Sequence, residues 1–134
     1  MTKPIVQSVV FAASPRELYD IYLDPKRHVA FTGGKVKVSA TPGSPFSAFD
    51  GKLAGKMLWT VPGELIVQRW RSTAWAKTDA DSILILTFSE AGKQGRIDLV
   101  HVNVPEHDHA GVTNGWKKFY WTPLKAYLRG TKQA

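Results

Sequence analysis

Four consecutive residues near the end of the chain carry side chains that can bind a metal ion. Glu106-His107-Asp108-His109 combines two imidazoles with two carboxylates, which are ligands for zinc or copper. The two histidines are two positions apart and do not share a helix face, and no fourth ligand is evident elsewhere in the chain. We therefore predict no metal site. We interpret the segment as a polar loop before the last helix, with Thr113 or Asn114 as the N-cap.

His101 is the residue best placed for acid–base chemistry. It lies in the apolar run Val100-His101-Val102-Asn103, which reads as a strand. Sequence spacing suggests no carboxylate partner for it. Two interpretations stay open: His101 lines a cavity as a polar group for a ligand, or it lies partly solvated near the rim of the sheet.

Other catalytic signatures are missing from the sequence. It contains no cysteine, no nucleophile motif, no glycine-rich phosphate loop and no dinucleotide-binding fingerprint. The sequence therefore predicts a container for a ligand more clearly than a reaction, and it predicts no cofactor.

Length and charge limit the class of protein. The 134 residues fit one domain over residues 1–134, and the formal net charge is +7. Lysine and arginine are spread along the chain, without zinc-finger spacing or a known RNA-binding motif, so we expect no nucleic-acid partner. We also expect a cytoplasmic protein without a membrane span, because no signal-peptide core and no run of about 18 apolar residues occurs.

The last part of the chain predicts a long amphipathic helix, starting near Gly111–Gly115 and ending near Arg129. Apolar and aromatic residues recur there in steps of three and four. They are Trp116, Phe119, Tyr120, Pro123, Leu124 and Tyr127. Such a helix must bury its aromatic stripe against a large surface.

The rest of the chain predicts one strand, two short helices and six further strands. Residues 4–13 read as the first strand, Ser14-Pro15-Arg16-Glu17 opens a helix with a capping box, and Pro25 opens a second helix that ends at Gly33-Gly34. The six further strands are expected at residues 35–40, 46–49, 52–61, 64–71, 83–89 and 96–104. The fold class is therefore α+β, with a seven-stranded antiparallel sheet.

Asp50-Gly51 predicts a two-residue hairpin of type I′. Pairing Phe49 with Lys52 across this turn places Met57 and Trp59 together on the apolar face of the hairpin. The opposite face is expected to be polar and solvated, so the sheet has one covered side. The candidate residues for lining a cavity are Met57, Trp59, Trp70, His101, Phe119, Tyr120 and Tyr127.

Several segments, in order and spacing, resemble one known family. They are Gly33-Gly34, Phe46-Ser47-Ala48-Phe49-Asp50-Gly51 with Gly55, residues 62–71, and Val104-Pro105-Glu106-His107 running into residues 115–121. The chain resembles the branch of the START/Bet v 1-like (SRPBCC) superfamily that contains homologues of the activator of the 90-kDa heat-shock-protein ATPase (the AHSA family). This resemblance implies the helix-grip fold: a curved seven-stranded antiparallel sheet around a long C-terminal helix, with two short helices after the first strand.

The resemblance implies several functions. The branch includes a domain of a eukaryotic co-chaperone, which suggests a stress response, and the superfamily includes carriers of hydrophobic molecules and polyketide cyclases. We expect a non-catalytic domain that binds a small hydrophobic molecule and exists as a monomer or homodimer. The alternatives are an accessory module that binds a chaperone or other protein, and a cyclase- or hydrolase-like enzyme.

Overall fold

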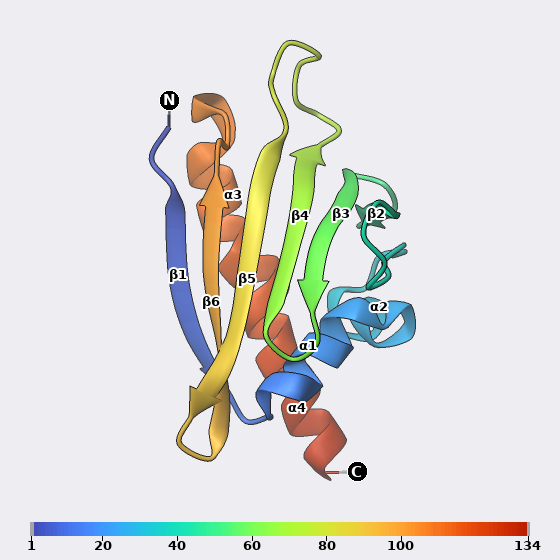
Figure 1. Ribbon diagram of the computed structural model, residues 1–134, viewed down its shortest axis with the longest axis vertical. Coiled ribbons are helices and arrows are strands. Elements are labelled where there is room, and N and C mark those ends of the chain that lie inside the picture. The colour runs from blue at the N-terminus through green and yellow to red at the C-terminus, as the bar shows by residue number, and fades with distance from the viewer. Residues whose placement is uncertain (1, 134) are drawn as a thin grey trace.

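A computed structural model describes residues 2–133 and contains a single antiparallel sheet with its helices on one face (Figure 1). The strand order across the sheet is β1-β6-β5-β4-β3-β2. The strands are β1 Ile5–Phe11, β2 Pro45–Ala48, β3 Leu53–Val61, β4 Leu65–Ser72, β5 Ser82–Ala91 and β6 Gln94–Val102. The C-terminal helix crosses behind the sheet in Figure 1, and the two short helices lie near the lower end of the sheet. Within residues 2–133 no helix is both long and apolar enough to cross a membrane.

Six of the seven predicted strands are present in the part of the chain that the structure describes. The segment at residues 35–40 makes a single bridge, between Lys37 and Ser47, and does not continue as a strand. Its other polar groups find different partners: the Lys35 N–H donates to the Asp50 carboxylate at 2.9 Å, and the Ser39 hydroxyl bonds that of Ser44 at 2.8 Å. A backbone whose bonds are made by turns and side chains cannot also form a regular ladder.

The two short helices form where their capping residues predict. Ser14 accepts a hydrogen bond from the Glu17 N–H at the start of α1 (Pro15–Leu23). Asp24 caps α2 (Pro25–Thr32) in the same way. Gly33 then ends α2 with a φ of 91°, a left-handed conformation that glycine adopts without steric cost.

The C-terminal helix begins earlier than predicted. A 3₁₀ turn, η1 (Glu106–Asp108), leads directly into α3 (His109–Gly115), so the predicted polar loop is helical and neither Thr113 nor Asn114 is the N-cap. The Thr113 hydroxyl instead donates to the carbonyl of His109, one turn back. Hydrogen bonding to the preceding turn lets a threonine sit inside a helix.

A π-helical segment then changes which residues of this helix are buried. After α3 come η2 (Trp116–Trp121, π-helical) and α4 (Thr122–Gln133). A π turn holds more residues than an α turn, so the buried stripe moves around the helix. The buried positions are Trp116, Tyr120, Trp121, Leu124 and Leu128, whereas Phe119, predicted to share the stripe, is 49% exposed.

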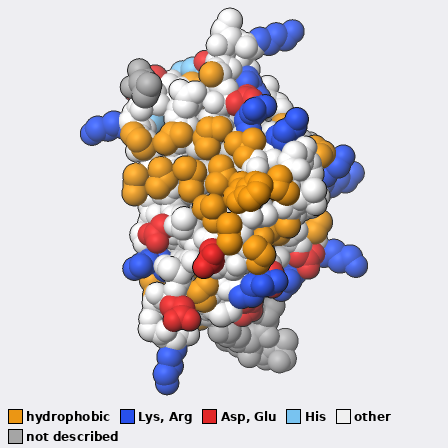
Figure 2. All heavy atoms as spheres, viewed as in Figure 1, with side chains coloured by type: hydrophobic (Ala, Val, Ile, Leu, Met, Phe, Trp, Pro, Cys, Tyr) orange, Lys and Arg blue, Asp and Glu red, His pale blue; other side chains and the backbone are white. Residues whose placement is uncertain are grey.

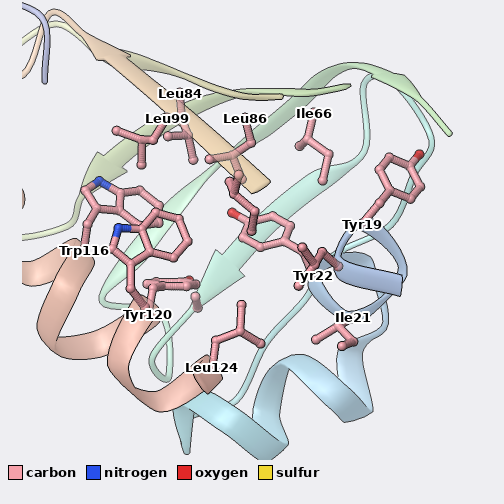
Figure 3. Close-up of a cluster of buried hydrophobic side chains, with 14 of the residues drawn as sticks. Tyr19, Ile21, Tyr22, Ile66, Leu84, Leu86, Leu99, Trp116, Tyr120 and Leu124 are labelled. Carbon is pink, nitrogen blue, oxygen red and sulfur yellow. The ribbon is translucent and has the colours of Figure 1, made fainter. Parts of the chain in front are cut away.

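The core lies between the inner face of the sheet and the helices (Figure 3). Leu84, Leu86 and Leu99 project from β5 and β6 toward Trp116 and Tyr120 of η2. Residues of α1 fill the other end, next to Ile66 of β4. The helices are therefore held by apolar contact with one face of the sheet.

A β-bulge in β3 separates Met57 from Trp59, and the prediction that they share a face is wrong. Met57 pairs with Gln68 and Trp59 with the next residue of β4, Val67, so Leu58 is an extra residue. One extra residue in a strand moves the following side chains to the opposite face. Met57 is fully buried in the core, whereas Trp59 lies on the outer face and is 58% exposed.

The prediction of a polar outer face is right for the hairpin, where Ser47 and Lys56 lie on that face, and wrong for the middle of the sheet. A row of apolar side chains crosses five strands there, each residue paired in register with the next, and Figure 2 shows apolar side chains gathered across this face. The row consists of Val6, Val100, Ile85, Val67 and Trp59. Together with its apolar neighbours on the same face, Val102, Ile83, Leu65 and Val61, we call it the outer band.

Candidate functional site

A crevice of about 330 Å³ lies between the start of the C-terminal helix and the inner face of β3 and β4. We call it the aromatic crevice, because five of its lining residues are aromatic. The sheet and the turn before β3 supply Phe49, Lys52, Leu53, Trp70 and Ser72, and the helix supplies Asp108, Gly111, Val112, Gly115, Trp116, Phe119 and Tyr120. A mostly apolar depression with a few polar groups is the usual form of a small-molecule site.

The helical lining follows from the helix period. Its seven members recur in steps of three and four, so they form one stripe along the helix. Two of them, Gly111 and Gly115, have no side chain, and at Gly115 this leaves space beside the ring of Phe119. A Cβ at Gly115 would reach only ordinary contact with Phe119, at 3.6 Å. A side chain at position 115 would therefore extend into this space without a backbone clash.

Trp70 contributes an unsatisfied hydrogen-bond donor beside the crevice. Its side chain is 4% exposed, and its indole N–H has no hydrogen-bond partner among the described residues. Leaving such a donor unpaired in the interior costs about 1–3 kcal/mol. A bound molecule removes this cost where its acceptor atom reaches the N–H, which is itself buried.

A second indole fixes the loop that borders the crevice. The Trp75 N–H donates to the Asp108 carboxylate at 2.7 Å and so ties the β4–β5 loop to the start of the helix. The Arg71 guanidinium lies over the Trp75 ring at 5.8 Å and also binds Asp81 at 2.7 Å. These contacts hold Asp108 at the edge of the crevice.

The side chains of the Glu106–His109 segment diverge. His107 Nε2 bonds the carboxylate of Asp79 at 2.8 Å, and this bond is the main cause that lowers the pKa of Asp79. His109 Nε2 donates to the carbonyl of Lys3 at 2.8 Å, on the strand side. Among residues 2–133 there is no group of three or more histidine, cysteine, aspartate or glutamate side chains placed to hold a metal ion.

His101 is fully buried behind the crevice and is held by three linked hydrogen bonds. The Ser82 hydroxyl donates its proton to the carbonyl of Trp70 at 2.6 Å, so His101 Nε2–H must donate to the Ser82 oxygen at 2.8 Å. His101 Nδ1 then accepts from the Trp116 indole N–H at 3.1 Å. These bonds define a neutral imidazole, and burial lowers the pKa of His101 to about 3, with the charge of His109 as a smaller cause.

The Ser82–His101 pair has the wrong polarity for a nucleophile and its base. In a serine–histidine pair that performs catalysis, the imidazole accepts the hydroxyl proton and a carboxylate supports the charge formed on the ring. Here the imidazole donates to the serine, and an N–H occupies the place of that carboxylate. The arrangement joins β5, β6 and the C-terminal helix.

A second buried histidine, His28, contacts the crevice residue Tyr120. His28 Nδ1–H donates to the carbonyl of Tyr22 at 2.7 Å, and Nε2 accepts from the Tyr120 hydroxyl at 3.0 Å. Burial lowers the pKa of His28 to about 4 and raises that of Tyr120. His28 was not among the predicted site residues, although its three-residue spacing to Phe31 placed both on one face of α2.

The structure places the predicted lining residues in two groups. Trp70, Phe119 and Tyr120 line the aromatic crevice. The others lie away from it: Met57 accepts a bond from Gln68 in the core, Trp59 is on the outer face, His101 is behind Trp70, and Tyr127 packs on Phe31. The glycine pair one turn apart in the helix was the sequence signal that could have located the crevice.

An antiparallel sheet covered on one face by a long C-terminal helix defines an α+β protein of the fold that a solved HSP90 activator also has. The chain belongs to the family of Activator of Hsp90 ATPase homolog 1-like proteins, whose model matches residues 12–129. The family expected from the sequence is thus confirmed.

A curated relative and two solved structures illustrate this similarity. The chain is 30% identical over 118 residues to the activator of 90 kDa heat shock protein ATPase homolog of Dictyostelium discoideum, covering 87% of this chain and 30% of that protein. It spans about a third of the length of the curated relatives it matches. An HSP90 activator from Plasmodium falciparum shares the fold with a TM-score of 0.85 and 19% identity, covering 95% of this chain and 96% of the other. The Aha1 dimer from Colwellia psychrerythraea does so with a TM-score of 0.77 and 16% identity, covering 92% and 94%.

Proposed function

We propose that the aromatic crevice binds a small, mainly apolar molecule that carries one hydrogen-bond acceptor, and that it does so without catalysis. The observation that carries this proposal is the unpaired, buried N–H of Trp70 in a lining that is otherwise largely aromatic and aliphatic. Apolar walls supply affinity, and a single polar group supplies orientation.

The dimensions of the crevice fit this class of ligand. Its volume of about 330 Å³ lies at the lower end of the roughly 300–1,000 Å³ typical of small-molecule sites. Trp116 and Tyr120 form its buried wall, and the half-exposed Phe119 lies at its mouth. Lys52 and Asp108 add one charge of each sign to the lining, so a neutral ligand is favoured over an ion.

The proposal is tested by filling the crevice from the helix. Gly115→Leu places a side chain in the space beside Phe119, whereas Gly130→Leu makes the same change in α4, where a Cβ meets nothing within 4 Å. Both variants gain helix propensity, so stability does not separate them. Binding of prodan, a fluorescent naphthalene with one carbonyl acceptor, should fall at least tenfold in Gly115→Leu and stay unchanged in Gly130→Leu.

A second arm of the test examines the Trp70 N–H. Trp70→Phe keeps an aromatic ring but removes the donor, so it should weaken prodan about three- to tenfold, as expected for one hydrogen bond. It should have a smaller effect on a naphthalene probe that lacks the carbonyl. Equal prodan binding by all three variants and the wild type would show that the crevice is not the binding site.

A second candidate function is a protein-binding module related to the co-chaperone activator. It is favoured by the 30% identity to the activator homologue of Dictyostelium discoideum, of which this chain spans 30%. This role predicts that the chain binds a 90-kDa heat-shock chaperone and changes its rate of ATP hydrolysis. An ATPase assay with and without the chain measures both the sign and the size of the effect.

A further inference from the structure

The outer band is an apolar surface on the side of the sheet opposite the helices (Figure 2). Its central row runs from Val6 on β1, which is 71% exposed, to Trp59 on β3, which is 58% exposed. The bulge in β3 places Trp59 on this face, where it contributes nothing to the core. An exposed indole at the end of a continuous apolar row needs a partner surface to become buried.

The size of the band favours a weak association. Strands lie about 4.8 Å apart and residues of one face about 6.8 Å apart along a strand, so nine residues cover roughly 300 Å² in projection. This reaches the range of the largest apolar patch of a typical monomer, about 300–600 Å². A standard interface needs about 800 Å² on each partner, of which the outer part is polar rim. The band can therefore form the centre of an interface whose rim is the charged margin of the same face.

The charges beside the band favour a second copy of this chain as the partner. Two copies with a formal charge of +7 each repel one another unless they meet at a surface that carries little of that charge. The charged side chains that flank the band are not all paired: Arg96 is next to Asp98 at 3.3 Å, Arg69 and Arg71 share Asp81 at 3.9 and 2.7 Å, and Lys56 lies across from Arg69. These groups together carry +2 of the chain's formal +7. Most of the positive charge therefore lies away from this face, and an acidic partner would find more of it elsewhere on the chain.

We propose that two copies associate face to face through the outer band, about a two-fold axis parallel to the strands and close to Ile85. Ile85 is the middle residue of the central row, so this axis places Trp59 of each copy over Val6 of the partner subunit. A large ring then meets a small side chain. An axis along the row would instead set the two Trp59 rings against each other and hold the middle of the band apart. Face-to-face packing of two sheets at about 10 Å is a common arrangement.

The test uses two substitutions at exposed positions. Sedimentation velocity of the wild type across micromolar to millimolar concentrations should show a monomer–dimer equilibrium. Trp59→Glu and Val6→Arg should each weaken the dimer at least tenfold, because each buries a charge against an apolar side chain. Unchanged far-ultraviolet circular dichroism would confirm that both variants are folded.

Mixing the two variants decides the geometry. In a mixed dimer the introduced glutamate faces the introduced arginine, while the second contact is the native pair of Val6 and Trp59, so dimers should reappear in the mixture. A mixture that stays monomeric would overturn the proposed axis. A wild type that is monomeric at millimolar concentration, or a dimer unaffected by both substitutions, would overturn the interface. So would a monomeric wild type that binds neutral phosphatidylcholine vesicles through Trp59, because that result would assign the band to a lipid surface.

Discussion

At the scale of single residues, the two buried histidines have defined neutral forms. His101 carries its proton on Nε2 and His28 on Nδ1, because a carbonyl acceptor or an indole donor fixes the polarity of each bond. Protonation of His101 would place a second N–H against that of Trp116. Because both rings are buried, the pKa of His101 is lowered to about 3 and the pKa of His28 to about 4.

These pKa values predict how stability depends on pH. In the unfolded chain both histidines bind a proton below about pH 6.5, whereas in the folded chain they stay neutral down to about pH 3–4. The unfolded state thus binds more protons in this window, so the free energy of unfolding falls as pH falls. Each histidine contributes at most about 1.4 kcal/mol per pH unit.

Urea denaturation at pH 7.5, 6 and 5 measures this slope. The histidines should contribute almost no slope above pH 7. His101→Gln should lower stability at every pH but reduce the slope below pH 6.5, because one titrating group is gone. A slope that is the same in wild type and in this variant would show that His101 is protonated in the folded protein.

At the scale of elements, two insertions of one residue decide what the core and the crevice contain. The bulge at Leu58 sends Trp59 outward, and the π turn in η2 exposes Phe119 while it buries Trp121. Both irregularities keep the element intact and change only the direction of its side chains.

The bulge predicts opposite results for two neighbouring truncations. Met57→Ala should lower the free energy of unfolding by about 2–5 kcal/mol, because Met57 is fully buried. Trp59→Ala should change it by less than about 1 kcal/mol in the monomer, because the ring is mostly exposed. Chemical denaturation at low micromolar concentration measures both. A larger loss for Trp59→Ala than for Met57→Ala would show that the bulge is absent.

At the scale of the whole molecule, the chain has two different faces. The helical side holds the core, the buried histidines and the aromatic crevice, while the opposite side carries the outer band (Figures 1 and 2). Lysines of the C-terminal helix, such as Lys117 and Lys118, lie on the helical side, where they do not oppose contact through the band.

This distribution predicts that added salt strengthens the dimer. Screening reduces the repulsion between two copies of charge +7, while the apolar contact itself is not weakened. The dissociation constant measured by sedimentation should therefore fall as sodium chloride rises from low to moderate concentration. Binding to a nucleic acid would show the opposite dependence, because it gains from counterion release. A dimer that dissociates in salt would indicate charge pairing across the interface.

The sequence by itself determined the local elements and the family. Ser14, Asp50-Gly51 and Gly33 specify caps and turns through their own backbone and side chains, and the expected positive φ occurs at Asp50 and Gly51. Six of the seven expected strands and a long C-terminal helix formed. Such features depend on residues a few positions apart, which is the range over which a pattern is informative.

Only the tertiary structure decided which side chains meet. The direction in which Trp59 and Phe119 point depends on one inserted residue in a strand and one π turn in a helix. Neither irregularity is visible in the hydrophobic pattern of the sequence. The bond between His28 and Tyr120 joins residues 92 positions apart, and the crevice is lined both by glycines of α3 and by Trp70 of β4. A cavity is a difference between the volumes of packed elements. The glycine pair at positions 111 and 115 could indicate which helix face lacks side chains, but only the packing shows that a crevice remains there.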